Sequence, residues 1–152
     1  MTDLSSYLGS IIGSQVTLNH DRDTVLLSGV KDDYITVYTS QDTVLHYYLH
    51  NLTCLSESPV LTENHFSGDI RPTAIRQAEE LPNTFSELME SFRGRKIVVH
   101  GLNSRTISGF LFECSNDFIK IVTSPDDLVH YPIHQILSVS LNSRSRTDEA
   151  CA

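Results

Sequence analysis

Two histidine pairs with the same spacing are the residues of this chain whose types could bind a metal. His46 and His50 are four residues apart, and so are His130 and His134. Zinc needs bonds of roughly 2.0–2.1 Å to each imidazole, whereas residues four apart in a β-strand lie about 13 Å from each other. The flanking residues favour strands, and no acidic or cysteine ligand follows at a regular offset. We therefore predict structural histidines that hydrogen-bond the backbone where the last two strands of a unit meet; a short turn holding His50 and His134 is the alternative that would bring each pair closer.

Paired carboxylates and a small basic cluster are the other groups with chemical potential. Both carboxylate pairs, Asp32–Asp33 and Asp126–Asp127, lie in sequences typical of solvated β-turns. The basic cluster follows the end of a predicted helix, where positive charge is favourable, and comprises Arg93, Arg95 and Lys96. The chain has no GxSxG, P-loop or glycine-rich dinucleotide motif. We predict no catalytic residue, no metal and no cofactor, so the protein is not expected to be an enzyme.

An internal repeat relates the two histidine pairs. Residues 33–56 align without a gap on residues 117–140, and nine of the 24 positions are identical. Upstream, residues 4–18 match residues 85–99 at an offset of 81, which pairs Gly13 with Gly94. Repeated sequence predicts a repeated structural unit.

Each copy has the pattern of one short helix followed by five short strands. In the second copy the helix is marked by apolar residues at i, i+3, i+4 and i+7, with Thr84 and Glu87 forming a capping box: Phe85, Leu88, Met89 and Phe92. Five runs with period-two alternation follow, separated by turn residues. The alternation predicts that the following residues are core: Val16, Leu18, Ile35 and Val37 in the first copy, and Ile97, Val99, Ile119 and Ile121 in the second.

These elements predict a mainly β protein made of two tandem five-stranded barrels of the Sm-like (SH3-like) kind, each preceded by a short helix. Closing a small sheet into a barrel removes its exposed edges. Gly109 would allow the tight bend that a barrel needs, whereas the first copy has Val25 there and its bend is either gentler or held by Gly29. The predicted organisation is a first barrel at 1–56, an acidic linker at 57–84 with at most one or two helical turns, a second barrel at 85–141 and a disordered tail at 142–152.

The charge of the chain excludes some classes of partner. It has 11 basic and 19 acidic side chains, a formal net charge of −8. An acidic surface repels phosphate, so we expect neither sequence-independent nucleic-acid binding nor binding to anionic membranes. The N-terminus has no basic segment followed by a long apolar run, and no segment approaches the roughly 20 apolar residues of a membrane span. We expect synthesis in the cytoplasm without a signal peptide.

The three cysteines are not spaced as a metal or redox motif. Cys54 and Cys114 lie in apolar, strand-like runs, which predicts packed and shielded thiols. Cys151 lies in the polar tail and is expected to be exposed and free to form an intermolecular disulfide.

The order of elements resembles known families. The stretch from Gly94 to Ile121 and its final strand resemble the Sm-like barrel, and the repeats resemble those of the outer spore coat protein B family of endospore-forming bacteria over about 110 of the 152 residues. The matching positions are Gly94, Gly109, Asp117–Phe118, Tyr131, Pro132, His134, Ile136 and Ser138–Ser140 in the second copy, and Gly13, Asp33–Tyr34, Tyr47, His50 and Leu52 in the first.

This resemblance implies a non-enzymatic structural component of the spore coat or outer spore layer, made in the mother-cell cytoplasm. Its partners would be other spore coat proteins, and it could form homo-oligomers. The alternative is a regulatory Sm-like module that binds nucleic acid or a small ligand. RNA-binding members of that superfamily carry a basic–glycine pair in their second motif, and the matching stretch here, 130–136, has none.

Overall fold

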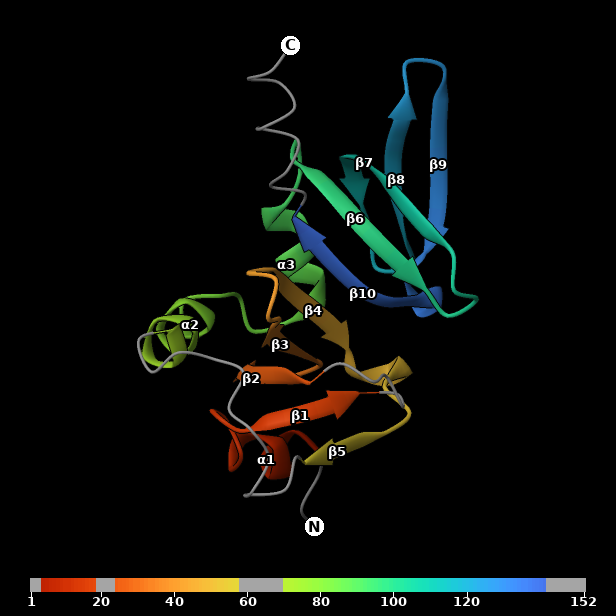
Figure 1. The fold of residues 1–152 in the computed structure, drawn as a ribbon. Helices are drawn as coiled ribbons and strands as arrows, with labels where there is room; N and C mark the ends of the chain where they lie inside the picture. The colour runs from red at the N-terminus through yellow and green to blue at the C-terminus, as the bar shows by residue number, and fades with distance from the viewer. Residues whose placement is uncertain (1–3, 19–23, 58–69, 142–152) are drawn as a thin grey trace. The chain divides into compact units, whose positions relative to one another are not determined.

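The computed structural model describes residues 4–18, 24–57 and 70–141. The chain divides into two compact units, Met1–Phe85 and Ser86–Ala152. The elements in chain order are α1 (Leu4–Gly9), β1 (Gln15–Leu18), β2 (Val25–Val30), β3 (Tyr34–Tyr38), β4 (Val44–Tyr48), the 3-10 helix η1 (Leu49–Asn51), β5 (Leu55–Glu57), α2 (Ile70–Glu79), α3 (Phe85–Ser91), β6 (Lys96–Gly101), β7 (Thr106–Cys114), β8 (Phe118–Ser124), β9 (Asp127–Pro132), the 3-10 helix η2 (Ile133–Gln135) and β10 (Ile136–Leu141) (Figure 1). The protein is mainly β, as its alternating sequence predicts.

The strands of both units are antiparallel and follow the same order. In the first unit the order is β5-β1-β2-β3-β4, and in the second it is β10-β6-β7-β8-β9. The registers correspond position by position: Ile35 is opposite Tyr47 in the first unit, and Ile119 is opposite Tyr131 in the second. A β-bulge also occurs at matching places, between Leu27 and Gly29 and between Leu111 and Glu113. Such bulges bend the strand that carries them, so both sheets bend at the same position.

Neither series of strands closes on itself, which corrects the expectation of closed barrels. No pairing joins β4 to β5 or β9 to β10 in the parts of the chain that the structure describes. The 3-10 helices explain this: η1 and η2 take the chain directly away from the fourth strand, and the fifth strand pairs with the first strand of its own unit, β5 with β1 and β10 with β6. Pro132, the last residue of β9, also lacks the N–H that a ladder needs.

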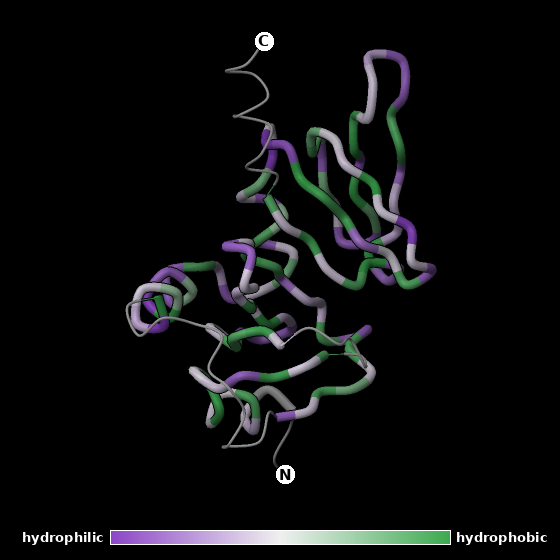
Figure 2. The backbone as a smooth tube through the Cα atoms, in the orientation of Figure 1, coloured by the Kyte–Doolittle hydropathy of each residue, from purple (hydrophilic) through white to green (hydrophobic). Residues whose placement is uncertain are grey.

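The predicted core positions are buried in both units. All eight residues that the alternation selects are exposed by 2% or less. The apolar face of α3 is also buried, since Phe85, Leu88, Met89 and Phe92 are exposed by 4% or less. Figure 2 shows hydrophobic stretches mainly along the strands, whereas the β8–β9 turn is hydrophilic. Leu27 and Leu111 also occupy matching positions on the second strand of each unit, and both are fully buried.

The two glycines that the repeat aligns have matching backbone roles. Gly13 and Gly94 adopt positive φ angles of 95° and 80° after the first helix of each copy. The N–H of Gly13 donates to the carbonyl of Leu27 and that of Gly94 to the carbonyl of Leu111, each over 2.8 Å. These bonds attach the start of each sheet to its second strand.

Helix α2 lies in the segment that was expected to be mostly linker. It is ten residues long and packs on β2, with Ala78 exposed by 2% and Ala74 by 6%. Ala74 and Leu26 form a small buried cluster, and the partly buried Tyr38 packs against it. Gly29 makes the close approach possible, because a Cβ at Gly29 would lie 2.6 Å from the Cβ of Ala78. Helix α2 therefore covers the outer face of the first sheet. Residues 58–69 of the linker lie outside the described residues.

Gly29→Ala is expected to displace α2 from β2. The added methyl group meets Ala78, which has no flexible atoms that could move aside, and overpacking of this kind costs about 1–3 kcal/mol. Amide hydrogen exchange in residues 70–79 should become at least about tenfold faster, as that loss implies. The control is Gly9→Ala, because nothing lies within 4 Å of the added carbon there. Unchanged exchange in Gly29→Ala would show that α2 does not depend on this contact.

Candidate functional site

The histidines of the first copy lie in different environments. His46 is on β4 and is exposed by only 4%. Its Nδ1 and the Thr36 hydroxyl on the neighbouring strand are 2.9 Å apart, within hydrogen-bonding distance, and the Tyr34 ring meets it edge-on. Burial lowers the pKa of His46 to about 4, so this imidazole is neutral at pH 7. The partner found for Nδ1 is thus a side-chain hydroxyl, where a backbone partner was expected.

The other three histidines of the two pairs, His50, His130 and His134, are exposed on their units. His50 lies in η1 and stacks at a tilt against Tyr48, with ring centroids 5.1 Å apart. His134 lies in η2, so the alternative of a short turn describes both second members of the pairs. His130 is exposed on β9, opposite Lys120 and edge-on to Phe118. Among the described residues, no group of three histidine, cysteine, aspartate or glutamate side chains could hold a metal ion.

The two carboxylate pairs have different roles. Asp126 and Asp127 are exposed at the β8–β9 turn, as expected of a solvated turn, and the Thr123 hydroxyl donates to Asp127 Oδ2 over 2.7 Å. Asp33 is more than a solvated turn residue: its Oδ1 accepts a 2.6 Å hydrogen bond from the backbone N–H of Phe85, the first residue of α3. An N-terminal helix N–H is satisfied in this way by a residue 52 positions earlier. Spacing along the chain gives no signal for such a long-range cap.

Arg93 of the basic cluster and Cys114 both contact Glu90. Arg93 Nη1 lies 2.7 Å from Glu90 Oε1 in an exposed ion pair, while the Cys114 thiol donates to Glu90 Oε2 over 2.8 Å. Partial burial, with this hydrogen bond, raises the pKa of Cys114 to about 12, which makes the thiol a poor nucleophile. Both Cys54 and Cys114 are partly exposed, so neither is as shielded as their apolar contexts predict. Cys151 lies outside the described residues.

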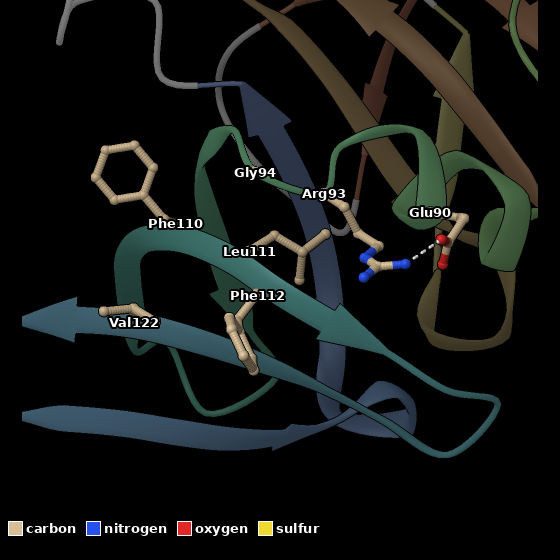
Figure 3. A pocket seen from close by; sticks show the side chains of 7 residues that line it. All are labelled: Glu90, Arg93, Gly94, Phe110, Leu111, Phe112 and Val122. Atoms are coloured by element: carbon tan, nitrogen blue, oxygen red, sulfur yellow. Dashed lines mark hydrogen bonds and ion pairs between the residues drawn. The ribbon is translucent and has the colours of Figure 1, made fainter.

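An exposed apolar surface on β7, β8 and β9 is the strongest candidate for a functional site. Phe110 and Phe112 are 48% and 57% exposed, and Leu128 is 43% exposed. Figure 3 shows both phenyl rings and Val122 around a shallow depression that Arg93 and Glu90 border on one side. A second depression continues from Phe112 and Val122 to the β8–β9 turn. We call this surface, formed by Phe110, Phe112, Val122 and Leu128, the β7–β8 face.

The first unit buries the matching surface. The positions that correspond to Phe110, Phe112 and Val122 are Leu26, Ser28 and Tyr38, of which Leu26 is 0% and Ser28 3% exposed. Helix α2 packs over this side of β2. The alternating run at 105–114 predicts a strand, but the prediction did not identify its outward phenylalanines as a surface. The available signal was two aromatic residues flanking the inward-facing Leu111.

The β7–β8 face has the features of a binding surface. Among the residues that the structure describes, we find no group of side chains arranged for catalysis. The β7–β8 face is open, apolar at its centre and bordered by charges of both signs, Arg93 and Lys120 against Glu90 and Glu113. Surfaces with an apolar centre and a polar rim are typical of protein interfaces. No helix of the described residues is long and apolar enough to cross a membrane.

Comparison with known proteins finds distant similarity to a spore coat protein. The chain is 25% identical over 146 residues to "Spore coat protein B" of Bacillus subtilis (strain 168), and the alignment covers 93% of this chain. It spans 36% of the length of that curated relative. No protein-family model matches the chain. The similarity points to a spore coat family.

Proposed function

We propose that this chain is a non-enzymatic structural component of a bacterial spore coat and acts through protein–protein contacts. The observation that carries the proposal is the similarity to a spore coat protein along 93% of the chain. The β7–β8 face supports it, because two half-exposed phenylalanines on a rigid sheet provide an apolar centre for association. In this proposal the chain is made in the cytoplasm of the mother cell, and its partners are other coat proteins.

We also propose that each unit is an opened variant of the Sm-like barrel, with repeats at 1–56 and 85–141. The support is the shared strand order, in which the fifth strand lies beside the first, and the matching bulges on the second strand. Each sheet follows a short helix, α1 or α3, and a positive-φ glycine. A crystal structure of the full chain would test this proposal: we expect no ladder between β9 and β10, and a ladder that joins them would contradict the opened form.

A fluorescently tagged copy is expected to concentrate around the forespore during sporulation of the bacterium that encodes this chain. The tagged protein should also remain with the coat fraction after spores are washed in high salt, because apolar contacts are not screened by ions. The same tag expressed alone is the control. Uniform fluorescence of the mother cell throughout sporulation, with no tagged protein in washed spores, would overturn the coat assignment.

A regulatory nucleic-acid module is the competing function. The net charge of −8 opposes it, since binding to phosphates requires positive charge. Filter binding of single-stranded RNA at low and high salt separates the two functions. Tight binding that weakens steeply with salt would favour the nucleic-acid function, and no binding at low salt would oppose it.

A further inference from the structure

We propose that the β7–β8 face binds the same face of a second copy of this chain and forms a two-fold dimer. The proposal goes beyond a coat function, because it concerns the protein alone in solution. Its starting point is the difference between the two units: α2 covers the outer face of the first sheet, whereas the matching positions of the second sheet leave Phe110 and Phe112 about half exposed. Exposed apolar side chains that gather on one face, here with charged residues around them, are a feature of association sites.

A helix similar to α2 does not fit the second unit. In the first unit Gly29 and Thr36 are opposite each other, and Gly29 leaves room for Ala78. The corresponding pair in the second unit is Glu113 and Lys120, whose charged groups form a 3.0 Å ion pair. A helix seated as α2 is seated would bury that ion pair under an apolar stripe, which carries a desolvation cost. A partner of the β7–β8 face must instead contact the phenyl rings and leave the Glu113–Lys120 ion pair at the edge of the interface.

The charges at the two ends of the β7–β8 face select a second copy as this partner. Arg93 and its ion-pair partner Glu90 border the depression at one end, and Asp126 and Asp127 border the depression at the other. Phe112 and Val122 line both depressions and therefore lie at the centre. A two-fold axis through this centre exchanges the ends, so Arg93 of each copy would face the acidic turn of the other. Two-fold interfaces are self-complementary in this manner.

The apolar area of the face is small, so we expect the dimer to be weak and reversible. Two half-exposed phenyl rings leave roughly 200 Å² of apolar surface on each copy, which is a minor part of the roughly 1,200–2,000 Å² that a stable interface buries. The rim charges and strand backbones must supply the rest. We therefore expect a dissociation constant in the micromolar range.

Sedimentation velocity of the full chain at increasing concentration tests the dimer. The buffer contains a reducing agent, so that a disulfide through Cys151 cannot contribute. Phe112→Ser is expected to weaken the dimer by at least about tenfold, since it removes an apolar anchor at the centre. The control is Leu102→Ser, which removes a similarly exposed apolar side chain (45%) from the β6–β7 turn. Circular dichroism of each variant confirms that it is folded.

Charge reversal distinguishes this two-fold face from any other dimer. Arg93→Glu and Asp126→Arg should each weaken self-association, because each puts like charges opposite each other twice. An equimolar mixture of the two variants should recover the dimer, because both cross-contacts then join opposite charges. A monomer at all concentrations up to about 1 mM, or a dimer that neither Phe112→Ser nor the charge reversals weaken, would overturn the proposal. Either outcome would leave the coat assignment intact, since that is tested by localisation.

Discussion

Gly109→Val is expected to destabilise the second unit by about 3 kcal/mol, near the upper end of what overpacking costs. A Cβ at this position would lie 2.4 Å from the carbonyl oxygen of Val122 and 2.8 Å from Cγ2 of Ile121. The nearer atom belongs to the backbone of β8 and cannot rotate away. The clash must therefore separate β7 from β8, where Phe110 pairs with Val122. Urea unfolding followed by circular dichroism should show a lower midpoint for the transition of this unit.

The control for this substitution is Ser108→Val, which adds the same side chain at the adjacent, exposed position of β7. Surface substitutions of this kind change stability by no more than about 0.5 kcal/mol. Valine occurs naturally at the matching position of the first unit, where Val25 is 7% exposed. Equal midpoints for Gly109→Val and Ser108→Val would mean that β7 and β8 can move apart at Gly109 at little cost.

The contrast between Val25 and Gly109 shows what the sequence of this protein could predict. The alternation of apolar and polar residues identified the buried positions of the strands to which it was applied. It is a reliable signal because a register error of one residue would expose the whole apolar face of a strand to water. The helical spacing of Phe85, Leu88 and Met89 was equally informative, since a short helix must bury one face. Gly109 was predicted to allow a tight bend. The structure shows a close approach there, because a Cβ would meet the backbone of Val122, and it places the β-bulge farther along β7, between Leu111 and Glu113.

Features that depend on contacts between distant segments were not predictable in this way. Helix α2 has a weak apolar pattern, and its two buried alanines pack against residues almost 50 positions earlier, Ala78 against Gly29 and Ala74 against Leu26. The cap from Asp33 to Phe85 has the same character. The closed barrel was expected because closure removes sheet edges, but η1 and η2 direct the chain elsewhere. Without knowledge of α2, the different exposure of Leu26 and Phe110 could not be predicted, and the β7–β8 face was missed for that reason.

The aligned histidines differ in their surroundings, and this difference leads to a pH prediction. His46 is enclosed beside Thr36 and Tyr34, whereas His130 at the matching position is exposed beside Lys120. Burial lowers the pKa of His46 from an ordinary 6.5 to about 4 in the folded protein. Between these values the unfolded chain binds a proton that the folded chain does not. Stability from this group is therefore complete above about pH 6.5 and decreases as the pH falls toward 4.

The first unit is expected to lose about 3 kcal/mol of stability through His46 between pH 7 and pH 4, since a shift of one pKa unit corresponds to about 1.4 kcal/mol. Carboxylates also titrate in this range, so the quantity to measure is the difference between wild type and His46→Gln in urea unfolding at each pH. Glutamine can still hydrogen-bond the Thr36 hydroxyl but does not titrate. His46→Gln should be less stable than wild type at pH 7, because glutamine packs less well, and should lose less stability on acidification. His130→Gln, the same substitution at the exposed position, should keep the pH dependence of wild type. If His46→Gln and wild type lose equal stability down to pH 4, then His46 is protonated without cost, and its imidazole must be accessible to water in the folded protein.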